Sequence, residues 1–352
     1  MKLDILLATV SGYLAAFGVV DRPQTPKIRD YVIEHVRIPG GASGVTLDAE
    51  LTLPAGNAPV PGIVLITGSG PQNKNEELVG HKPFLVLSDH LTRSGFGVLR
   101  FDDRGVGDST GDFTTATARD LASDAAAALS YLKAHPGILP GKTGYLGHSE
   151  GGYIAPIAQT MSAADFHVYL AGPALPLIPD VMAVQVEDIA RAEGSSEKTI
   201  AQETRLVADI TDALAKTENV EELKTSIPAI LERSGATASQ IKDNVAIWAT
   251  PWARAYVHHK PRPLLEALDI PVLALFGEYD LQVSAKENAP VMEAALKHPA
   301  SRTQVLEGLN HLFQPTSTGR VSEYLKIRTT IDPTALNAMT DWLKVVTAET
   351  KP

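Results

Sequence analysis

Residues 144–152 read Gly-Tyr-Leu-Gly-His-Ser-Glu-Gly-Gly, and they contain the pattern G-x-S-x-G directly after a short apolar run and before a segment of helical period. In this pattern the serine occupies a tight strand-to-helix turn, and the flanking glycines let the backbone bend sharply while the hydroxyl stays exposed. The new helix N-terminus adds positive potential where an oxyanion would form. Ser149 is therefore a candidate nucleophile, and an idle serine in a glycine-rich turn is the alternative.

The apolar runs on either side of this turn predict a mostly parallel sheet. Continuous runs of strand length are separated by segments of helical period, as in strands that crossover helices cover on both faces. These runs occupy residues 63–67, 98–101, 144–146, 168–171, 272–276 and 303–306. Residues 31–54 instead alternate between apolar and polar around Pro39-Gly40-Gly41, which predicts an antiparallel hairpin. We therefore expect an α/β fold whose mostly parallel sheet begins with antiparallel N-terminal strands.

A helical insertion is predicted between two of the later strands. Four amphipathic patterns cover roughly residues 181–192, 198–216, 220–231 and 238–248. We interpret residues 176–264 as a helical cap over the carboxyl ends of the sheet, with residues 23–175 and 265–352 forming the core. A separate four-helix domain with its own partner is the alternative. Near the end of the chain, Asp332-Pro333 supplies an N-cap and a first-turn proline for a closing helix through Val346.

The first 22 residues leave two hypotheses open. The apolar stretch from Ile5 to Val20 has the size of a signal-peptide core, and it is too short to span a bilayer comfortably. A signal peptide would make the protein periplasmic or secreted, with no stable membrane insertion after its removal. An N-terminal extension buried as a helix or strand would leave the protein in the cytoplasm.

Composition excludes several function classes. The chain has 352 residues, of which 44% are hydrophobic and 20% charged, which rules out a disordered or fibrous protein. Asp and Glu total 41 against 31 for Lys and Arg, so the basic surface of a general nucleic-acid binder is missing. The absence of Cys removes disulfides, Cys-ligated zinc and thiol nucleophiles. We expect a small-molecule partner and no nucleic acid, while the oligomeric state is not readable.

A serine nucleophile needs a base and a carboxylate that orients the base. Asp280 follows the apolar run 272–276, and Glu278 is its rival at the same strand end. His311 lies in the loop after the last run, at residues 303–306. The order Ser149, Asp280, His311 along the chain is that of the α/β-hydrolases.

Three blocks of sequence extend this resemblance. They are residues 68–76 (Gly-Ser-Gly-Pro-Gln-Asn-Lys-Asn-Glu), residues 101–113 and residues 147–152. Together they resemble the EstD-like bacterial carboxylesterases of the α/β-hydrolase superfamily, and the first block is more specific than the serine turn. The similarity covers roughly residue 22 to the C-terminus, including the predicted cap.

The resemblance implies a role for each of several residues. Ser149 resembles the nucleophile, Asp280 the orienting acid and His311 the base. The backbone N–H of Glu150 matches one oxyanion donor. The second donor is expected in the loop after Thr67, where Ser69 is our choice and Gly70 is close behind it.

The surroundings of the predicted triad are less specific. Trp252 and Tyr256 lie on the return segment of the cap and are candidate pocket residues, with packing of cap against core as the alternative. Asp102 and Arg104 are expected to pair with neighbouring loops beneath the site and not to bind a ligand.

The expected activity is hydrolysis of carboxylic esters with short to medium acyl chains, through a Ser-His-Asp triad and an acyl-enzyme. This chemistry requires no metal and no organic cofactor. An amidase, peptidase or thioesterase on the same triad is the first alternative. A non-enzymatic binding protein on the same scaffold is the second, and the complete triad argues against it.

Overall fold

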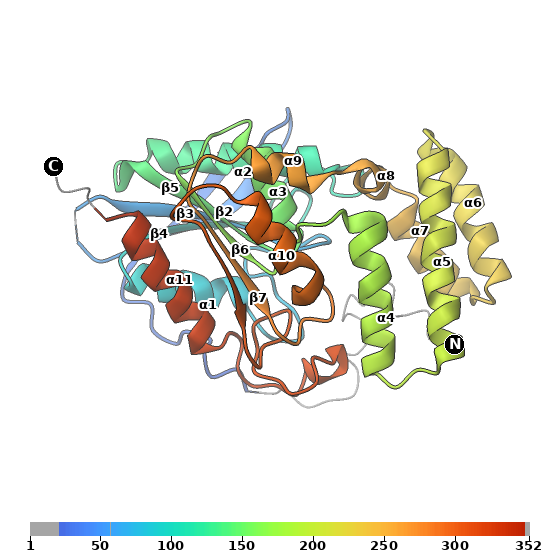
Figure 1. The fold of residues 1–352 in the computed structure, drawn as a ribbon. Helices are drawn as coiled ribbons and strands as arrows, with labels where there is room; N and C mark the ends of the chain where they lie inside the picture. The colour runs from blue at the N-terminus through green and yellow to red at the C-terminus, as the bar shows by residue number, and fades with distance from the viewer. Residues whose placement is uncertain (1–20, 57, 349–352) are drawn as a thin grey trace.

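A computed structural model describes residues 21–56 and 58–348 of the chain. Its centre is an eight-stranded sheet with the order β1-β2-β4-β3-β5-β6-β7-β8 (Figure 1). The strands are β1 (Val32–Pro39), β2 (Thr46–Leu53), β3 (Val60–Ile66), β4 (Gly97–Phe101), β5 (Ile138–His148), β6 (Phe166–Leu170), β7 (Val272–Gly277) and β8 (Arg302–Leu306). The apolar stretch at residues 5–20, with its two hypotheses, lies outside the described residues.

The pairing confirms the predicted fold class. β2 pairs antiparallel with both β1 and β4, and the remaining neighbours pair parallel. The predicted run at 168–171 differs in one detail, because Ala171 has a φ of 52° and lies beyond the end of β6. A left-handed residue cannot continue a strand.

Helices cover both faces of the sheet. Successive residues of a strand point to opposite faces, so each strand contributes side chains to two apolar cores. On β3, Ile63 and Leu65 pack into the core that contains α1 (Pro83–Arg93) and α11 (Pro333–Val346). Val64 and Ile66 point the other way, into the larger core. That core contains α2 (Ala118–Ala134), α3 (Gly151–Gln159), α9 (Pro261–Glu266) and α10 (Ala285–Ala295).

A helical insertion lies between β6 and β7 and projects beyond the sheet, on the right of Figure 1. It comprises η3 (Leu177–Val181), α4 (Met182–Ala192), α5 (Glu197–Lys216), α6 (Val220–Arg233), α7 (Ala238–Trp248) and α8 (Pro251–His258). Helices α4 to α7 coincide with the four predicted patterns to within two residues. Buried insertion residues such as Val186 and Ile227 share one apolar cluster with Val64 of β3 and Leu129 of α2. This continuity favours a cap over a separate domain.

Helices α8 and α9 have no counterpart in the predicted elements. They contain eight and six residues, so neither is long enough for an apolar stripe to repeat clearly. Each has a proline in its first turn, where the missing N–H costs nothing. α8 has a second local signal, because the Thr250 side chain caps its N-terminus by accepting from the Ala253 N–H at 3.2 Å.

The turn between β5 and α3 packs directly on the backbone of β3. A Cβ atom at Gly151 would lie 2.3 Å from the carbonyl oxygen of Ile66, and one at Gly147 would lie 2.3 Å from the backbone of Gly151. Between these glycines, Ser149 has a φ of 50°, and its N–H donates to the carbonyl of Leu170 at 2.8 Å. The glycines therefore provide space, and the surrounding backbone holds the strained serine.

We expect Gly151→Ala to lower the free energy of unfolding by roughly 3 kcal/mol or more, because its methyl group meets rigid backbone. Gly141→Ala is the control, since nothing lies within 4 Å of its added Cβ and only its φ of 74° opposes the change. That conformation costs about 1–2 kcal/mol. Urea unfolding followed by circular dichroism measures both losses, and equal losses would contradict the steric argument.

Candidate active site

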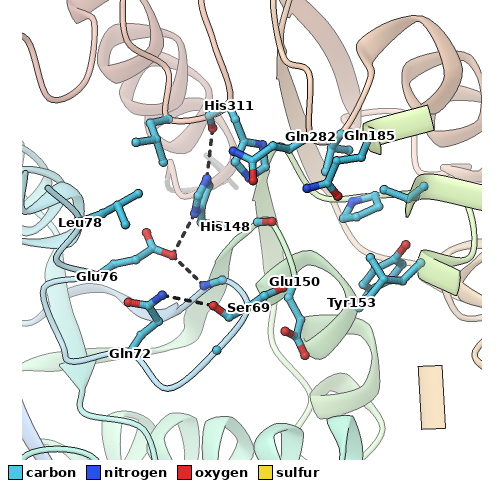
Figure 2. A pocket seen from close by; sticks show the side chains of 18 of the residues that line it. Ser69, Gln72, Glu76, Leu78, His148, Glu150, Tyr153, Gln185, Gln282 and His311 are labelled. Atoms are coloured by element: carbon cyan, nitrogen blue, oxygen red, sulfur yellow. Dashed lines mark hydrogen bonds and ion pairs between the residues drawn. The ribbon is translucent and has the colours of Figure 1, made fainter. Parts of the chain in front are cut away.

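A cavity of about 340 Å³ opens at the carboxyl ends of the parallel strands. Such positions are where open α/β sheets bind their ligands. Its walls come from the loop after β3, the β5–α3 turn, the loops after β7 and β8, and the insertion. Its lining includes Ser69, Gly70, Glu76, His148, Ser149, Glu150, Trp252 and His311. Figure 2 shows part of this lining.

The structure brings His311 and Asp280 together beneath this cavity. The Nδ1 atom of His311 lies 2.8 Å from Oδ2 of Asp280, and both side chains are buried. The other carboxylate oxygen of Asp280 accepts from the N–H groups of Gln282 and Val283, each at 2.8 Å. The carboxylate is thus fixed in place, and its position at Nδ1 favours the tautomer of His311 in which Nε2 is free to accept.

Glu278, the rival acid, lies elsewhere. Its Oε2 atom accepts from the N–H of Gly308 at 2.9 Å, and its side chain is exposed. Glu278 therefore stabilises the turn after β8, and the carboxylate that contacts His311 belongs to Asp280. Ser149 and His311 line the same cavity, so the structure gathers all three predicted triad residues at one place.

The two candidates for the second oxyanion donor both line the cavity. The neighbouring Gly68 N–H is already engaged, because it donates to Oε1 of Glu76 at 2.6 Å. The carbonyl oxygen of Ser69 accepts from the Gln72 side chain at 3.2 Å, and this hydrogen bond helps to fix the peptide between Ser69 and Gly70 (Figure 2). Gly70 has a φ of 86°, a conformation suited to glycine. Ser69 and Gly70 thus remain the two candidate donors of this loop, beside the Glu150 N–H at the start of α3.

Charged residues beneath the site link the loop after β3 to the loop after β4 and to helix α2. Thr67 donates to the carboxyl group of Asp103 at 3.0 Å, and the Gln72 N–H donates to it at 2.9 Å. Burial raises the pKa of Asp103 to about 8, although these hydrogen bonds oppose the shift. Asp102 accepts from Lys74 Nζ at 2.8 Å, and Arg104 donates to Asp124 of α2 at 2.7 Å. The 102–109 loop thus pairs with its neighbours, as expected, while the role of Asp103 was not predicted.

Glu150 connects the serine turn to the insertion through its side chain. Its Oε1 atom accepts from Trp252 Nε1 and from the Tyr256 hydroxyl, both at 2.7 Å. Burial raises the pKa of Glu150, and these two hydrogen bonds oppose the shift. Trp252 lines the cavity, whereas Tyr256 is fully buried behind it. The expectation of Tyr256 as a pocket wall therefore needs correction, since its ring packs between insertion and core.

His148 and Glu76 form a second buried pair that the sequence did not reveal. Nδ1 of His148 lies 2.9 Å from Oε1 of Glu76, and Nε2 lies 3.1 Å from the carbonyl oxygen of His311 (Figure 2). Burial alone would lower the pKa of His148, but the charge and hydrogen bond of Glu76 and the His311 carbonyl outweigh it and raise the pKa.

Within residues 21–56 and 58–348, no group of three or more His, Asp or Glu side chains has a geometry that could hold a metal ion. No helix there is both long and apolar enough to cross a bilayer.

Comparisons with known proteins agree with this architecture. The solved structure of the α/β-hydrolase GrgF from Penicillium has a TM-score of 0.56 at 17% identity, with 90% of this chain and 100% of that chain covered. A thermophilic esterase from Thermogutta terrifontis has a TM-score of 0.52 at 20% identity, with 89% and 99% covered. The sheet order, the serine turn and these matches define the α/β-hydrolase fold.

The family follows from the sequence match. A model of the X-Pro dipeptidyl-peptidase (S15) family matches residues 43–312, and the chain belongs to that family. Esterase EstD of Thermotoga maritima is 27% identical over 267 residues, which are 76% of this chain. The match spans 58% of the length of EstD. The predicted resemblance to EstD-like α/β-hydrolases is confirmed.

We expect Tyr256→Phe to lower the free energy of unfolding by about 2–3 kcal/mol at pH 8, because it removes a donor from a buried carboxylate. Tyr145→Phe is a matched control, since its hydroxyl donates to the neutral carbonyl of Ser162 at 3.0 Å. That loss should be about 1 kcal/mol. Thermal and urea unfolding compare the two, and a smaller effect at Tyr256 would contradict the assignment of the Glu150 contact.

Proposed function

We propose that the chain is a serine carboxylesterase that hydrolyses esters through an acyl-enzyme on Ser149. The observation that carries this proposal is the 2.8 Å contact between His311 Nδ1 and Asp280 Oδ2, with His311 and Ser149 lining one cavity. An oriented imidazole beside a serine on a strained turn is the arrangement that activates a hydroxyl for acyl transfer. The esterase EstD relative supports ester as the substrate bond.

In the first half of the reaction, Ser149 Oγ attacks the ester carbonyl while His311 Nε2 accepts the hydroxyl proton. The Glu150 N–H and a second N–H, from Ser69 or Gly70, stabilise the oxyanion of the tetrahedral intermediate. His311 then protonates the leaving alcohol, and the acyl group remains on Ser149.

In the second half, His311 takes a proton from water as the water attacks the acyl-enzyme. Collapse of the second tetrahedral intermediate returns the proton to Ser149 and releases the carboxylic acid. Asp280 stays ionised throughout and stabilises the imidazolium that forms twice per cycle. One ester and one water thus give one acid and one alcohol.

The cavity supports short to medium acyl chains as substrates. Its volume of about 340 Å³ is near the lower end of ligand pockets, which run from about 300 to 1,000 Å³. One wall is apolar and comes from the start of the insertion, through Leu177, Val181 and Met182. Such a wall suits an aliphatic chain and offers no partner to a charged group.

Peptide hydrolysis is the second candidate, because the family model describes X-Pro dipeptidyl-peptidases. Both activities use the same acyl-enzyme, so the leaving group separates them. Rates on p-nitrophenyl esters of two to twelve carbons, measured beside an X-Pro p-nitroanilide, test the proposal. We expect esters to dominate, with a maximum at the shorter chains. A higher rate on the anilide than on the esters would contradict the esterase proposal and favour peptide hydrolysis.

Ser149→Ala should abolish ester turnover and labelling by a fluorophosphonate, because it removes the nucleophile and leaves only residual catalysis over water. The loss should be on the order of 10⁵-fold or more in kcat. Ser130→Ala, on α2 and far from the cavity lining, controls for nonspecific labelling. Circular dichroism confirms that both variants fold. Undiminished turnover by Ser149→Ala would refute the serine mechanism.

Asp280→Asn should lower kcat by about 10⁴ by analogy with the serine-protease case, because the amide stabilises the wrong imidazole tautomer. Glu278→Gln should cost less than tenfold, because this exposed side chain accepts from the Gly308 N–H, whereas Asp280 is the carboxylate at His311. Steady-state kinetics on one short-chain ester measure both variants. A larger loss at Glu278 would reverse the assignment of the orienting acid.

A further inference from the structure

His148 lies between two hydrogen-bond acceptors. Nδ1 lies 2.9 Å from the Glu76 carboxylate and Nε2 lies 3.1 Å from the His311 carbonyl, and the ring is buried. In Figure 2 the His148 ring lies in line between Glu76 and His311. A neutral imidazole carries one N–H, so it can satisfy only one of these two acceptors.

Two proton arrangements satisfy both contacts. In one, His148 carries two protons and Glu76 is ionised. In the other, Glu76 is protonated and donates to Nδ1, while His148 is neutral. The same Glu76 oxygen also accepts from the Gly68 N–H at 2.6 Å. The hydroxyl oxygen of a protonated carboxyl group is a weaker acceptor than a carboxylate oxygen, so the short Gly68 contact to this same oxygen favours the ionised carboxylate.

We propose that His148 is an imidazolium at neutral pH, paired with ionised Glu76, and that this pair is a positioning device for the base His311. This inference rests on the proposed esterase function. The pair joins three loops: Glu76 holds the Gly68 N–H beside the oxyanion donors, His148 belongs to the serine turn, and its Nε2–H holds the backbone of His311.

The charges that face His148 agree with this state. Glu76 lies against Nδ1, and Asp280 is near enough to raise the pKa of His148 further. The His311 ring has its centroid 4.9 Å from that of His148, and it is neutral when it acts as a base. Because Glu76 cancels the charge of His148, the pair has no net charge and does not oppose protonation of His311 during the reaction.

Loss of this proton at higher pH has a defined consequence. The bond to the Glu76 carboxylate is charge-assisted and stronger than the bond to a neutral carbonyl. The proton that leaves is therefore the one on Nε2, and its lone pair then faces the His311 carbonyl. This repulsion displaces the base, and a small displacement in a catalytic site can cost up to about 10² in rate. Turnover should thus fall on the alkaline side as His148 is deprotonated, above its ordinary pKa of 6.5.

The test reads the proton directly, without turnover. Protein with ¹⁵N-labelled histidine is titrated from pH 5 to 10 and observed by long-range ¹H–¹⁵N correlation, and His148→Gln identifies the His148 signals. We expect both ring nitrogens of His148 to be protonated at pH 7 and one to lose its proton at higher pH. An unprotonated Nδ1 at pH 7 would place the proton on Glu76 and overturn the proposal. The result does not depend on which substrate the enzyme uses.

Two isosteric variants separate positioning from packing. Glutamine at 148 reproduces the Nε2 donor toward His311 but cannot titrate, whereas asparagine reproduces the Nδ1 donor toward Glu76. We expect His148→Gln to keep the acid limb of kcat/KM and lose the alkaline limb. His148→Asn should lower kcat by about 10-fold or more with a smaller change in KM. Because neither amide titrates, both variants should lose the alkaline limb and differ in kcat. An unchanged alkaline limb in His148→Gln, or equal kcat values for the two variants, would contradict the positioning role.

Discussion

The contact between the serine turn and the backbone of β3 sets the geometry of the whole site. Gly151 lies so close to the Ile66 carbonyl that no side chain fits, and this closeness places Ser149 beside the loop that follows β3. The positive φ of Ser149 is held by the hydrogen bond from its N–H to the Leu170 carbonyl at the end of β6 and by the close packing of Gly151 on β3. Since β7 and β8 end at the same edge, Asp280 and His311 reach this point from the other side.

Buried acids connect the loops around the serine turn. Glu76 joins the loop after β3 to His148, Asp103 holds that same loop from below, and Glu150 joins the turn to helix α8. A buried carboxylate is stable only with several donors, so each acid specifies the position of the groups that donate to it. The protein thus uses polar contacts to position loops that carry few apolar side chains.

Local patterns in the sequence predicted the sheet and the four longer insertion helices, because strand and helix periods are short-range signals. The G-x-S-x-G turn, also a short-range signal, pointed to Ser149 as the candidate nucleophile. The family resemblance favoured Asp280 over Glu278, and the contacts behind that preference are visible only in the structure, where the Gln282 and Val283 N–H groups fix the Asp280 carboxylate that faces His311. The Glu76–His148 pair joins residues 72 positions apart, and no periodicity reports such a contact. Tyr256 looked like a pocket residue because an aromatic side chain near a site suits both wall and core.

The central claim is that Ser149 carries the acyl group during turnover. Rapid acid quenching of a reaction with a slow ester, followed by mass spectrometry of the digested protein, tests it most directly. The account predicts that the peptide containing Ser149 gains the mass of the acyl group, within the first turnover and in about one equivalent per active site. Turnover without an adduct, or an adduct on another residue, would contradict the account.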